Sequence, residues 1–168
     1  MTKRRMLTHK ELGIPHWVHK QLKAVRAKLL ADEFQHTPDV YNRVNGQRFN
    51  MDCVARSFSE DTVYYSIRQH EHPCGTVACI GGWAYALQNG TPDGKGFLRF
   101  DMSAAEEFVI ETRYRWPRLG WLFYPNTEPG TEVNYGRITP QQAVVAIENY
   151  LYTGVPRWHE VVNGVEGE

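Results

Sequence analysis

Hydrophobic residues recur at helical spacing in the N-terminal segment. Val18, Leu22, Val25 and Leu29 follow one another at intervals of four, three and four residues, which places them on one face of a helix. The lysines of this segment fall off that face, and Pro15 is typical of a first helical turn. We therefore expect an N-terminal helix that packs its apolar face on the rest of the chain.

A second segment, at about residues 76–88, is apolar on every side. A helix of this kind belongs in the centre of a core. Two consecutive glycines inside it, Gly81 and Gly82, cost roughly 1 kcal/mol each relative to alanine. Another helix or a ligand must therefore approach closely there. The apolar positions on its main face are Val77, Ile80, Ala84 and Leu87.

Capping residues mark two helices in the second half of the chain. Both Ser103-Ala104-Ala105-Glu106 and Thr139-Pro140-Gln141-Gln142 have the sequence of a capping box. The helix after Thr139 has one apolar face and ends before Gly154, so it requires a partner helix. The residues of that face are Val144, Ile147 and Leu151.

Strand signals are weak by comparison. Only residues 62–67 and 97–100 resemble strands, and two short strands make at most a hairpin. We expect a mainly α fold, a single compact domain of about five to six helices around the central apolar helix, with at most a short β-hairpin. Residues 1–35 would form a basic arm and helix packed on the core, and residues 36–168 the helical core domain.

Composition supports one globular core, since 42% of the 168 residues are hydrophobic and 12% are aromatic. The 19 lysines and arginines balance 19 acidic residues, so the overall charge does not favour duplex nucleic acid. Residues 1–30 nevertheless hold eight basic residues and one acidic residue, Glu11. This segment is either a solvated helix face or a phosphate-contacting surface, which makes residues 3–28 a candidate contact for nucleic acid.

The location of the protein follows from features that are missing. The longest uncharged stretch, Val77–Leu87, is about half of the roughly 20 residues that span a bilayer, so we expect no membrane partner. The basic N-terminus is not followed by the apolar run of a signal peptide. Three cysteines, an odd number in a chain of this size, indicate reduced thiols and a cytoplasmic protein.

Several motifs recur in a fixed order between about residues 48 and 155. In that order and spacing the chain resembles a family of short uncharacterised proteins encoded by bacteria and their phages. The resemblance implies a shared fold, a phage or mobile-element context and a host-cytoplasmic location, and it implies no activity. The motifs are Phe49-Asn50-Met51, Cys74-Gly75-Thr76-x-x-Cys79-x-x-Gly82-x-Ala84, Leu122-Phe123, Ile138-Thr139-Pro140-x-Gln142-Ala143 and Thr153-Gly154.

Cys74 is a candidate nucleophile. A thiolate at the start of the apolar helix would be stabilised by the helix dipole, with His70, His72 or the distant His159 as the base. The Cys-Gly-Thr string is similar to the Cys-Gly-Ser of papain-like proteases. The papain-type tryptophan follows its cysteine directly, however, whereas Trp83 lies nine positions after Cys74. A buried structural cysteine is the alternative to a cysteine-dependent hydrolase or transferase.

The same segment allows a zinc site. His70, His72, Cys74 and Cys79 supply two histidines and two cysteines. Their spacing differs from the usual arrangement, and Pro73 stiffens the stretch in which the ligands would have to converge. The alternative is two exposed histidines before a helix. No other segment indicates a cofactor, and we expect none.

Arginines alternate with aromatic residues between residues 113 and 124. Guanidinium groups bind phosphate, and aromatic faces stack on bases. In the alternative interpretation, Leu119, Leu122 and Phe123 face the core and the arginine stems cover aromatic surface. The candidate ligand-binding residues are Arg113, Tyr114, Arg115, Trp116, Arg118 and Trp121.

Three functions follow, in this order. The first is a small non-enzymatic binding protein for a nucleotide-like anionic ligand or a protein partner, which includes another copy of the chain, in an accessory or counter-defence role. The second is a cysteine enzyme that uses Cys74. The third is a nucleic-acid-binding accessory protein that uses the basic N-terminal helix. No Walker-type loop, dinucleotide fingerprint or paired-acid signature indicates a kinase, a dehydrogenase or a glycosidase.

Overall fold

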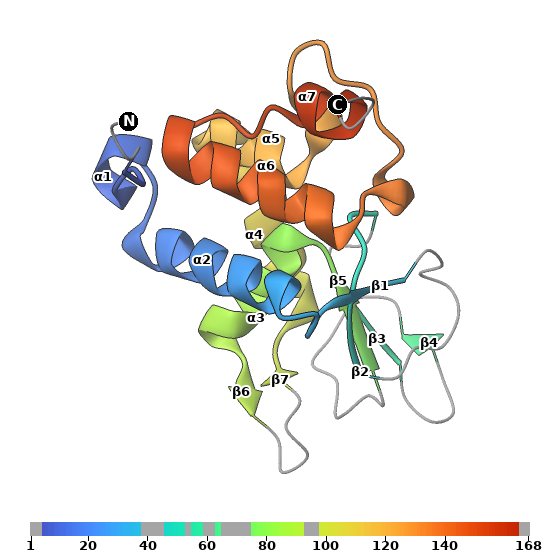
Figure 1. The fold of residues 1–168 in the computed structure, drawn as a ribbon. Helices are drawn as coiled ribbons and strands as arrows, with labels where there is room; N and C mark the ends of the chain where they lie inside the picture. The colour runs from blue at the N-terminus through green and yellow to red at the C-terminus, as the bar shows by residue number, and fades with distance from the viewer. Residues whose placement is uncertain are drawn as a thin grey trace.

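The helices of the chain gather around α3 (Ile80–Asn89), as Figure 1 shows for the computed structural model. Helix α2 (His16–Leu30) packs on both α3 and α6 (Pro140–Thr153). The part of the chain that the structure describes contains seven α-helices, which confirms a mainly helical single domain around an apolar helix. The described residues are 5–37, 46–52, 55–58, 63–64, 75–92 and 98–164.

The apolar face predicted for the N-terminal helix is confirmed in α2. Val18, Leu22, Val25 and Leu29 are all buried. Arg26 of α2 also forms an ion pair with Glu148 of α6, which helps to hold the two helices together. None of the described helices is both long enough and apolar enough to cross a membrane.

The central helix is shorter than expected. It begins at Ile80 rather than near residue 76, because Gly75–Ala78 form strand β5 with backbone partners on both sides. The N-cap is therefore Cys79, whose Sγ accepts the N–H of Gly82 at 3.4 Å. The close approach predicted at the glycines is confirmed at Gly81: an added Cβ would lie 2.7 Å from Cγ2 of Val109, a residue of a neighbouring helix.

The strand content exceeds the single hairpin that the sequence predicts. A mixed sheet has the order β1-β2-β5-β3-β4, and a separate pair joins β6 (Thr91–Pro92) to β7 (Leu98–Arg99). Strands β1 and β2 and strands β2 and β5 are parallel, whereas β3 is antiparallel to both β5 and β4. The sheet meets the helices where the Trp83 indole donates to the Arg48 carbonyl at 2.8 Å. The remaining strands are β1 (Gln35–His36), β2 (Gly46–Phe49), β3 (Ala55–Phe58) and β4 (Val63–Tyr64).

Helix α4 (Met102–Arg115) begins two residues earlier than a capping box at Ser103 would place it. Asp101, not Ser103, is the N-cap, and its Oδ1 accepts the N–H of Ala104 at 3.0 Å. An aspartate caps a helix as well as a serine does, so the carboxylate two residues upstream takes that position. Helix α5 (Pro117–Phe123) follows after a single residue, Trp116.

The C-terminal helices are capped as predicted in α6. Thr139 and Gln142 form the reciprocal capping box, and Gly154 ends the helix with φ +78°, a conformation that favours glycine. Helix α7 (Trp158–Asn163) packs on α6. Between α5 and α6 the chain forms two 3₁₀ turns, η1 (Pro125–Thr127) and η2 (Tyr135–Arg137).

Candidate ligand-binding site

The sharp change of direction between α4 and α5 exposes the arginine–aromatic segment. Trp116 ends one helix and precedes the next with φ −137° and ψ 78°, which is not helical. Pro117 disfavours a helical residue before it and suits the first turn of a new helix. These two effects of Pro117 place Arg115 at the end of α4 and Arg118 in the first turn of α5. Trp116 lies at the corner between the two helices.

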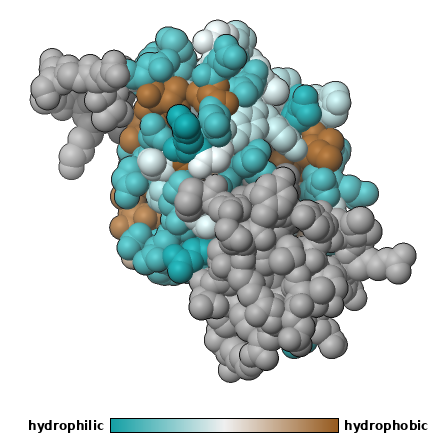
Figure 2. Space-filling model, turned by 90° about the vertical axis from the view of Figure 1, so that its right-hand side faces the viewer, coloured by the Kyte–Doolittle hydropathy of each residue, from teal (hydrophilic) through white to brown (hydrophobic). Residues whose placement is uncertain are grey.

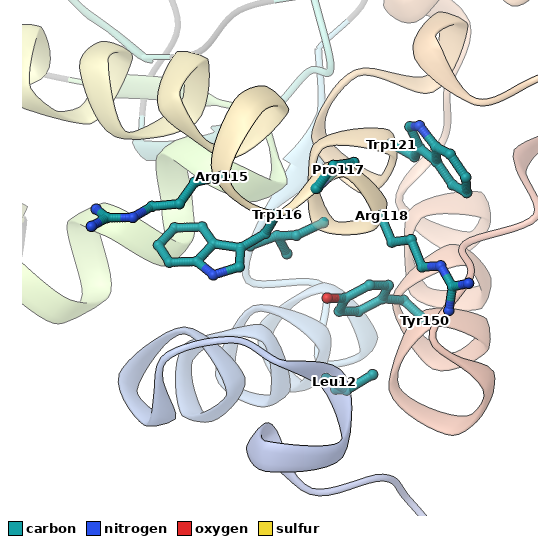
Figure 3. A pocket seen from close by; sticks show the side chains of 8 residues that line it. Leu12, Arg115, Trp116, Pro117, Arg118, Trp121 and Tyr150 are labelled. Atoms are coloured by element: carbon teal, nitrogen blue, oxygen red, sulfur yellow. The ribbon is translucent and has the colours of Figure 1, made fainter.

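A cavity of about 360 Å³ lies at this corner, between α1 (His9–Leu12), α5 and α6. Figure 3 shows its lining side chains, with Trp116 above and Leu12 below the ring of Tyr150. Four of the six residues predicted to bind a ligand lie here together. The lining residues are Leu12, Arg115, Trp116, Pro117, Arg118, Leu119, Trp121 and Tyr150.

Aromatic side chains form much of the wall. The ring of Tyr150 is 1% exposed, and burial raises the pKa of its hydroxyl against the opposing effect of the nearby Arg118 charge. No hydrogen bond to the Tyr150 hydroxyl is present among the described residues. Trp121 is half-buried, and its carbonyl accepts the indole N–H of Trp158 at 3.0 Å. The wall is therefore anchored to the core through Trp158.

The two arginines of the cavity differ in their surroundings. Arg115 donates to Glu111 at 2.9 Å, and its guanidinium lies 5.4 Å from the centre of the Trp116 ring. Within the described ranges Arg118 has no carboxylate partner. In Figure 3 the Arg115 side chain extends away from Tyr150, whereas the Arg118 guanidinium lies near that ring. Arg118 is thus the cation that an anionic ligand would meet first.

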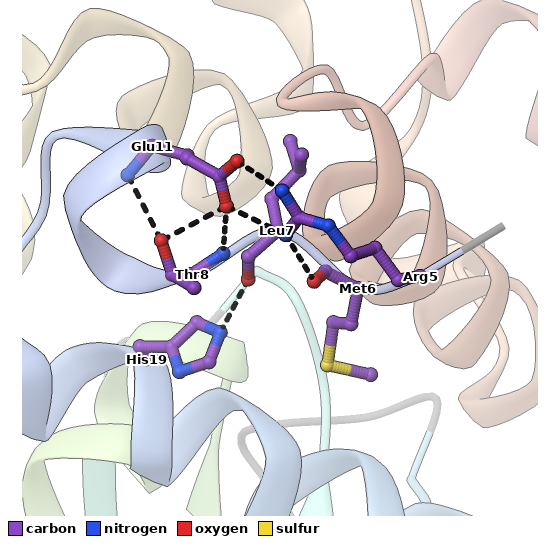
Figure 4. A network of polar contacts seen from close by, with 6 residues as sticks. All are labelled: Arg5, Met6, Leu7, Thr8, Glu11 and His19. Carbon is purple, nitrogen blue, oxygen red and sulfur yellow. Dashed lines mark hydrogen bonds and ion pairs between the residues drawn. The ribbon is translucent and has the colours of Figure 1, made fainter.

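The N-terminal segment contributes Leu12 to the wall of the cavity. The backbone N–H of Leu7 donates to the Leu151 carbonyl at 2.8 Å, which attaches the segment to the end of α6. The Leu7 carbonyl contacts the His19 ring nitrogen at 2.9 Å, and Arg5 pairs with Glu11 inside α1 (Figure 4). These contacts hold Leu12 in the cavity wall.

Two residues of the predicted set lie outside the cavity. The Arg113 guanidinium stacks over the ring of Tyr124, 4.9 Å from its centre. Tyr114 is 78% exposed. Both project from α4 before the corner, so contiguity in sequence does not bring them to the same surface.

The other candidate residues are less informative. His70, His72 and Cys74 lie outside the described residues. Cys79 is reduced and fully buried, and burial raises the pKa of its thiol to about 11, which disfavours metal binding or catalysis. His159 is exposed and contacts Asn163 on its own helix at 3.0 Å. The described residues contain no group of three side chains that could hold a metal ion.

The basic N-terminal segment is partly neutralised. Arg5, Arg26 and Lys28 form ion pairs with Glu11, Glu148 and Glu33, respectively. In the described part of this segment, the lysines without such a partner are Lys10, Lys20 and Lys23.

Sequence reasoning missed Leu12 and Tyr150, which complete the cavity. Tyr150 has apolar neighbours at helical spacing, Ala146 and Ile147, and resembles an ordinary core residue, whereas Leu12 stands among polar residues with no pattern that marks it. Only the tertiary fold, in which α6 packs on α5 and Leu12 of α1 lines the same cavity, brings them beside Trp116 and Arg118.

Comparisons with protein-family models, with curated proteins and with solved structures find no match to this chain. The resemblance to bacterial and phage proteins therefore stays a prediction from the sequence.

Proposed function

We propose that this protein binds a small anionic ligand of nucleotide type in the cavity at the α4–α5 corner. The observation that carries the proposal is the meeting of Trp116, Trp121 and Arg118 with the buried Tyr150 in one cavity. Its volume of about 360 Å³ lies within the range of small-molecule sites, roughly 300–1,000 Å³.

The chemistry of the walls matches the two halves of such a ligand. The half-buried indole of Trp116 provides a flat surface against which a base can stack. Arg118 offers a planar guanidinium that forms paired hydrogen bonds with a phosphate. The lining also includes the apolar residues Leu12, Pro117 and Leu119.

A calorimetric titration with the four common ribonucleoside 5′-monophosphates tests the proposal. We expect saturable one-to-one binding of at least one of them, weakened about tenfold or more in Trp116→Ala, because stacking contributes roughly 1–3 kcal/mol per base. Arg137→Ala is the matched control, since it removes an exposed cation from η2, outside the cavity. Absence of saturable binding to all four compounds would overturn the proposal.

A further inference from the structure

Three histidine rings lie together at the junction of α1 and α2. The rings of His9 and His16 lie 5.1 Å apart between their centres, and those of His9 and His19 lie 6.4 Å apart. His16 and His19 belong to α2, whereas His9 is the first residue of α1. The cluster therefore connects the two helices, and its members are close enough to repel one another when they carry a charge.

The groups that surround His19 in this cluster are positive or neutral. The charge of Lys23, on the same helix, acts on the His19 ring together with the other two histidines. Glu11 is the carboxylate of α1, and it is already bound by Arg5 and by the backbone N–H of Thr8 (Figure 4). Neither α1 nor α2 therefore offers a free carboxylate to a protonated His19.

The helices that pack on α2 do not supply one either. Glu148 is the acidic residue of α6, and it pairs with Arg26, whereas the sequence of α3 contains no acidic residue. Lys10 of α1 and Lys20 of α2 are further cations that have no acidic partner among the described residues. Protonation of the histidine cluster in acid thus adds charge to a region that is already positive.

His19 is the member of the cluster that is held away from water. Its ring is buried, and its Nε2 lies 2.9 Å from the Leu7 carbonyl oxygen, to which it donates. Burial is the largest effect on its pKa and lowers it, and the neighbouring cations lower it further, against the opposing effect of the Leu7 carbonyl. A charged His19 ring is therefore more stable where the residues that cover it have moved aside and water reaches it.

Residues 5–12 cover His19 through few contacts. Helix α1 buries none of its own residues. One backbone hydrogen bond, from the N–H of Leu7 to the Leu151 carbonyl at 2.8 Å, joins the segment to α6. Its apolar contribution comes from the half-buried side chains of Met6 and Leu12. Detachment of this segment therefore costs much less free energy than unfolding of the domain.

We propose that residues 5–12 are a pH-operated latch, which protonation of the histidine cluster releases from α2 and α6. Gly13 is its hinge, because it follows α1 directly and has φ +67°, a conformation that favours glycine. The latch is closed above about pH 6.5, where His19 is neutral, and it opens as the pH falls below that value. Leu12 leaves the cavity wall when the latch opens, whatever ligand the cavity binds.

Hydrogen exchange of the backbone amides at pH 7.5 and pH 5, corrected for intrinsic exchange rates, tests the latch. Protection of the Leu7 amide should fall about tenfold, since each pH unit below 6.5 favours the protonated open form by up to about tenfold. Protection of the Val25 amide, in the middle of α2, should stay unchanged. His19→Gln should keep Leu7 protected at pH 5, because glutamine donates to the same carbonyl but gains no proton. The matched His159→Gln, an exposed histidine of α7, should behave like the natural sequence.

A double variant, His9→Gln with His16→Gln, tests the cluster without removing the His19 contact. It should reduce the fall in Leu7 protection about threefold or more, because even in a water-like dielectric one charge at 6.4 Å has about this effect. Equal falls in the natural sequence, in His19→Gln and in the double variant would overturn the latch. A parallel loss of protection at Val25 would also overturn it, since acid would then unfold the whole domain. These outcomes involve no ligand, so they are independent of the proposed function.

Discussion

The carboxylate of Glu128 accepts the backbone N–H of Trp158 at 2.7 Å across thirty residues of sequence. It also accepts the N–H of Arg157 at 3.0 Å, so it caps α7 from the loop after α5. Trp158 in turn donates its indole N–H to the carbonyl of Trp121. Glu128 therefore links the C-terminal helix to the wall of the cavity.

We predict that Glu128→Ala destabilises the protein by about 2 kcal/mol, or roughly 4–8 °C in melting temperature, because two backbone donors lose a charged acceptor. The exposed Glu132→Ala is the control and should leave the melting temperature unchanged. Equal melting temperatures for the two variants, measured by thermal denaturation, would show that the cap is not stabilising.

Substitution of Gly81 tests the close packing of α3. An added Cβ would lie 2.7 Å from Val109 and 3.0 Å from Phe123, so Gly81→Leu should cost about 3 kcal/mol or more. Gly136→Ala, whose Cβ would lie 3.5 Å from its nearest neighbour, Asn134 Oδ1, should be nearly neutral. Equal unfolding midpoints in denaturant would contradict the packing described for α3.

The protein should lose stability in mild acid because of His19. Burial is the main cause that lowers the pKa of His19 below its ordinary value of 6.5, and the charges of Lys23, His9 and His16 act in the same direction. Neutral His19 therefore contributes stability that is fully present above about pH 6.5 and is lost as the pH falls toward its lower folded-state pKa. His19→Gln keeps a donor for the Leu7 carbonyl but does not titrate.

We expect His19→Gln to flatten the decline of melting temperature between pH 7 and pH 5. His19 contacts the Leu7 carbonyl and so helps to hold the N-terminal segment, which carries Leu12 of the cavity wall. Ligand affinity should therefore fall over the same pH range in the natural sequence and less in the variant. Parallel pH profiles for the two proteins would mean that other groups cause the acid sensitivity.

Cys79 should resist alkylation in the folded protein. Its thiol is buried, and its pKa of about 11 leaves little thiolate at neutral pH. Mass spectrometry after brief treatment with iodoacetamide should find Cys79 unmodified in buffer and modified in denaturant. Rapid labelling in buffer would place Cys79 on an accessible surface.

Local signals in the sequence were sufficient for the long helices. The apolar stripe of α2 and the capping box at Thr139 depend on residues within one helix, so they survive packing unchanged. The sheet could not be predicted in this way. Its strands have two to four residues, and β5 pairs with β2, which lies 25 or more residues earlier in the sequence. Short apolar runs such as Thr76-Val77 fit a helix equally well until those partners are known.

The candidate site was predictable only in part. Trp116, Arg118 and Trp121 lie close together in one segment, and alternation of arginine with aromatic residues is visible without a structure. Leu12 and Tyr150 come from opposite ends of the chain, and their position depends on how α1 and α6 pack. In the view of Figure 2, the coloured hydrophobic residues form small separate areas among hydrophilic ones. A second pocket, of about 430 Å³, lies between α6 and α7 and includes Val145 and Val161 in its lining, and no sequence signal pointed to it.

The central claim is that the cavity at the α4–α5 corner is the ligand-binding site, and the five tryptophan indole N–H signals in a nitrogen-15 NMR spectrum test it most directly. Titration with the ribonucleoside monophosphate that binds most tightly should shift the signals of Trp116 and Trp121, which line the cavity, and leave those of Trp17 and Trp83 in place. Saturation that leaves Trp116 and Trp121 unshifted, or that shifts Trp17 or Trp83 instead, would contradict the account.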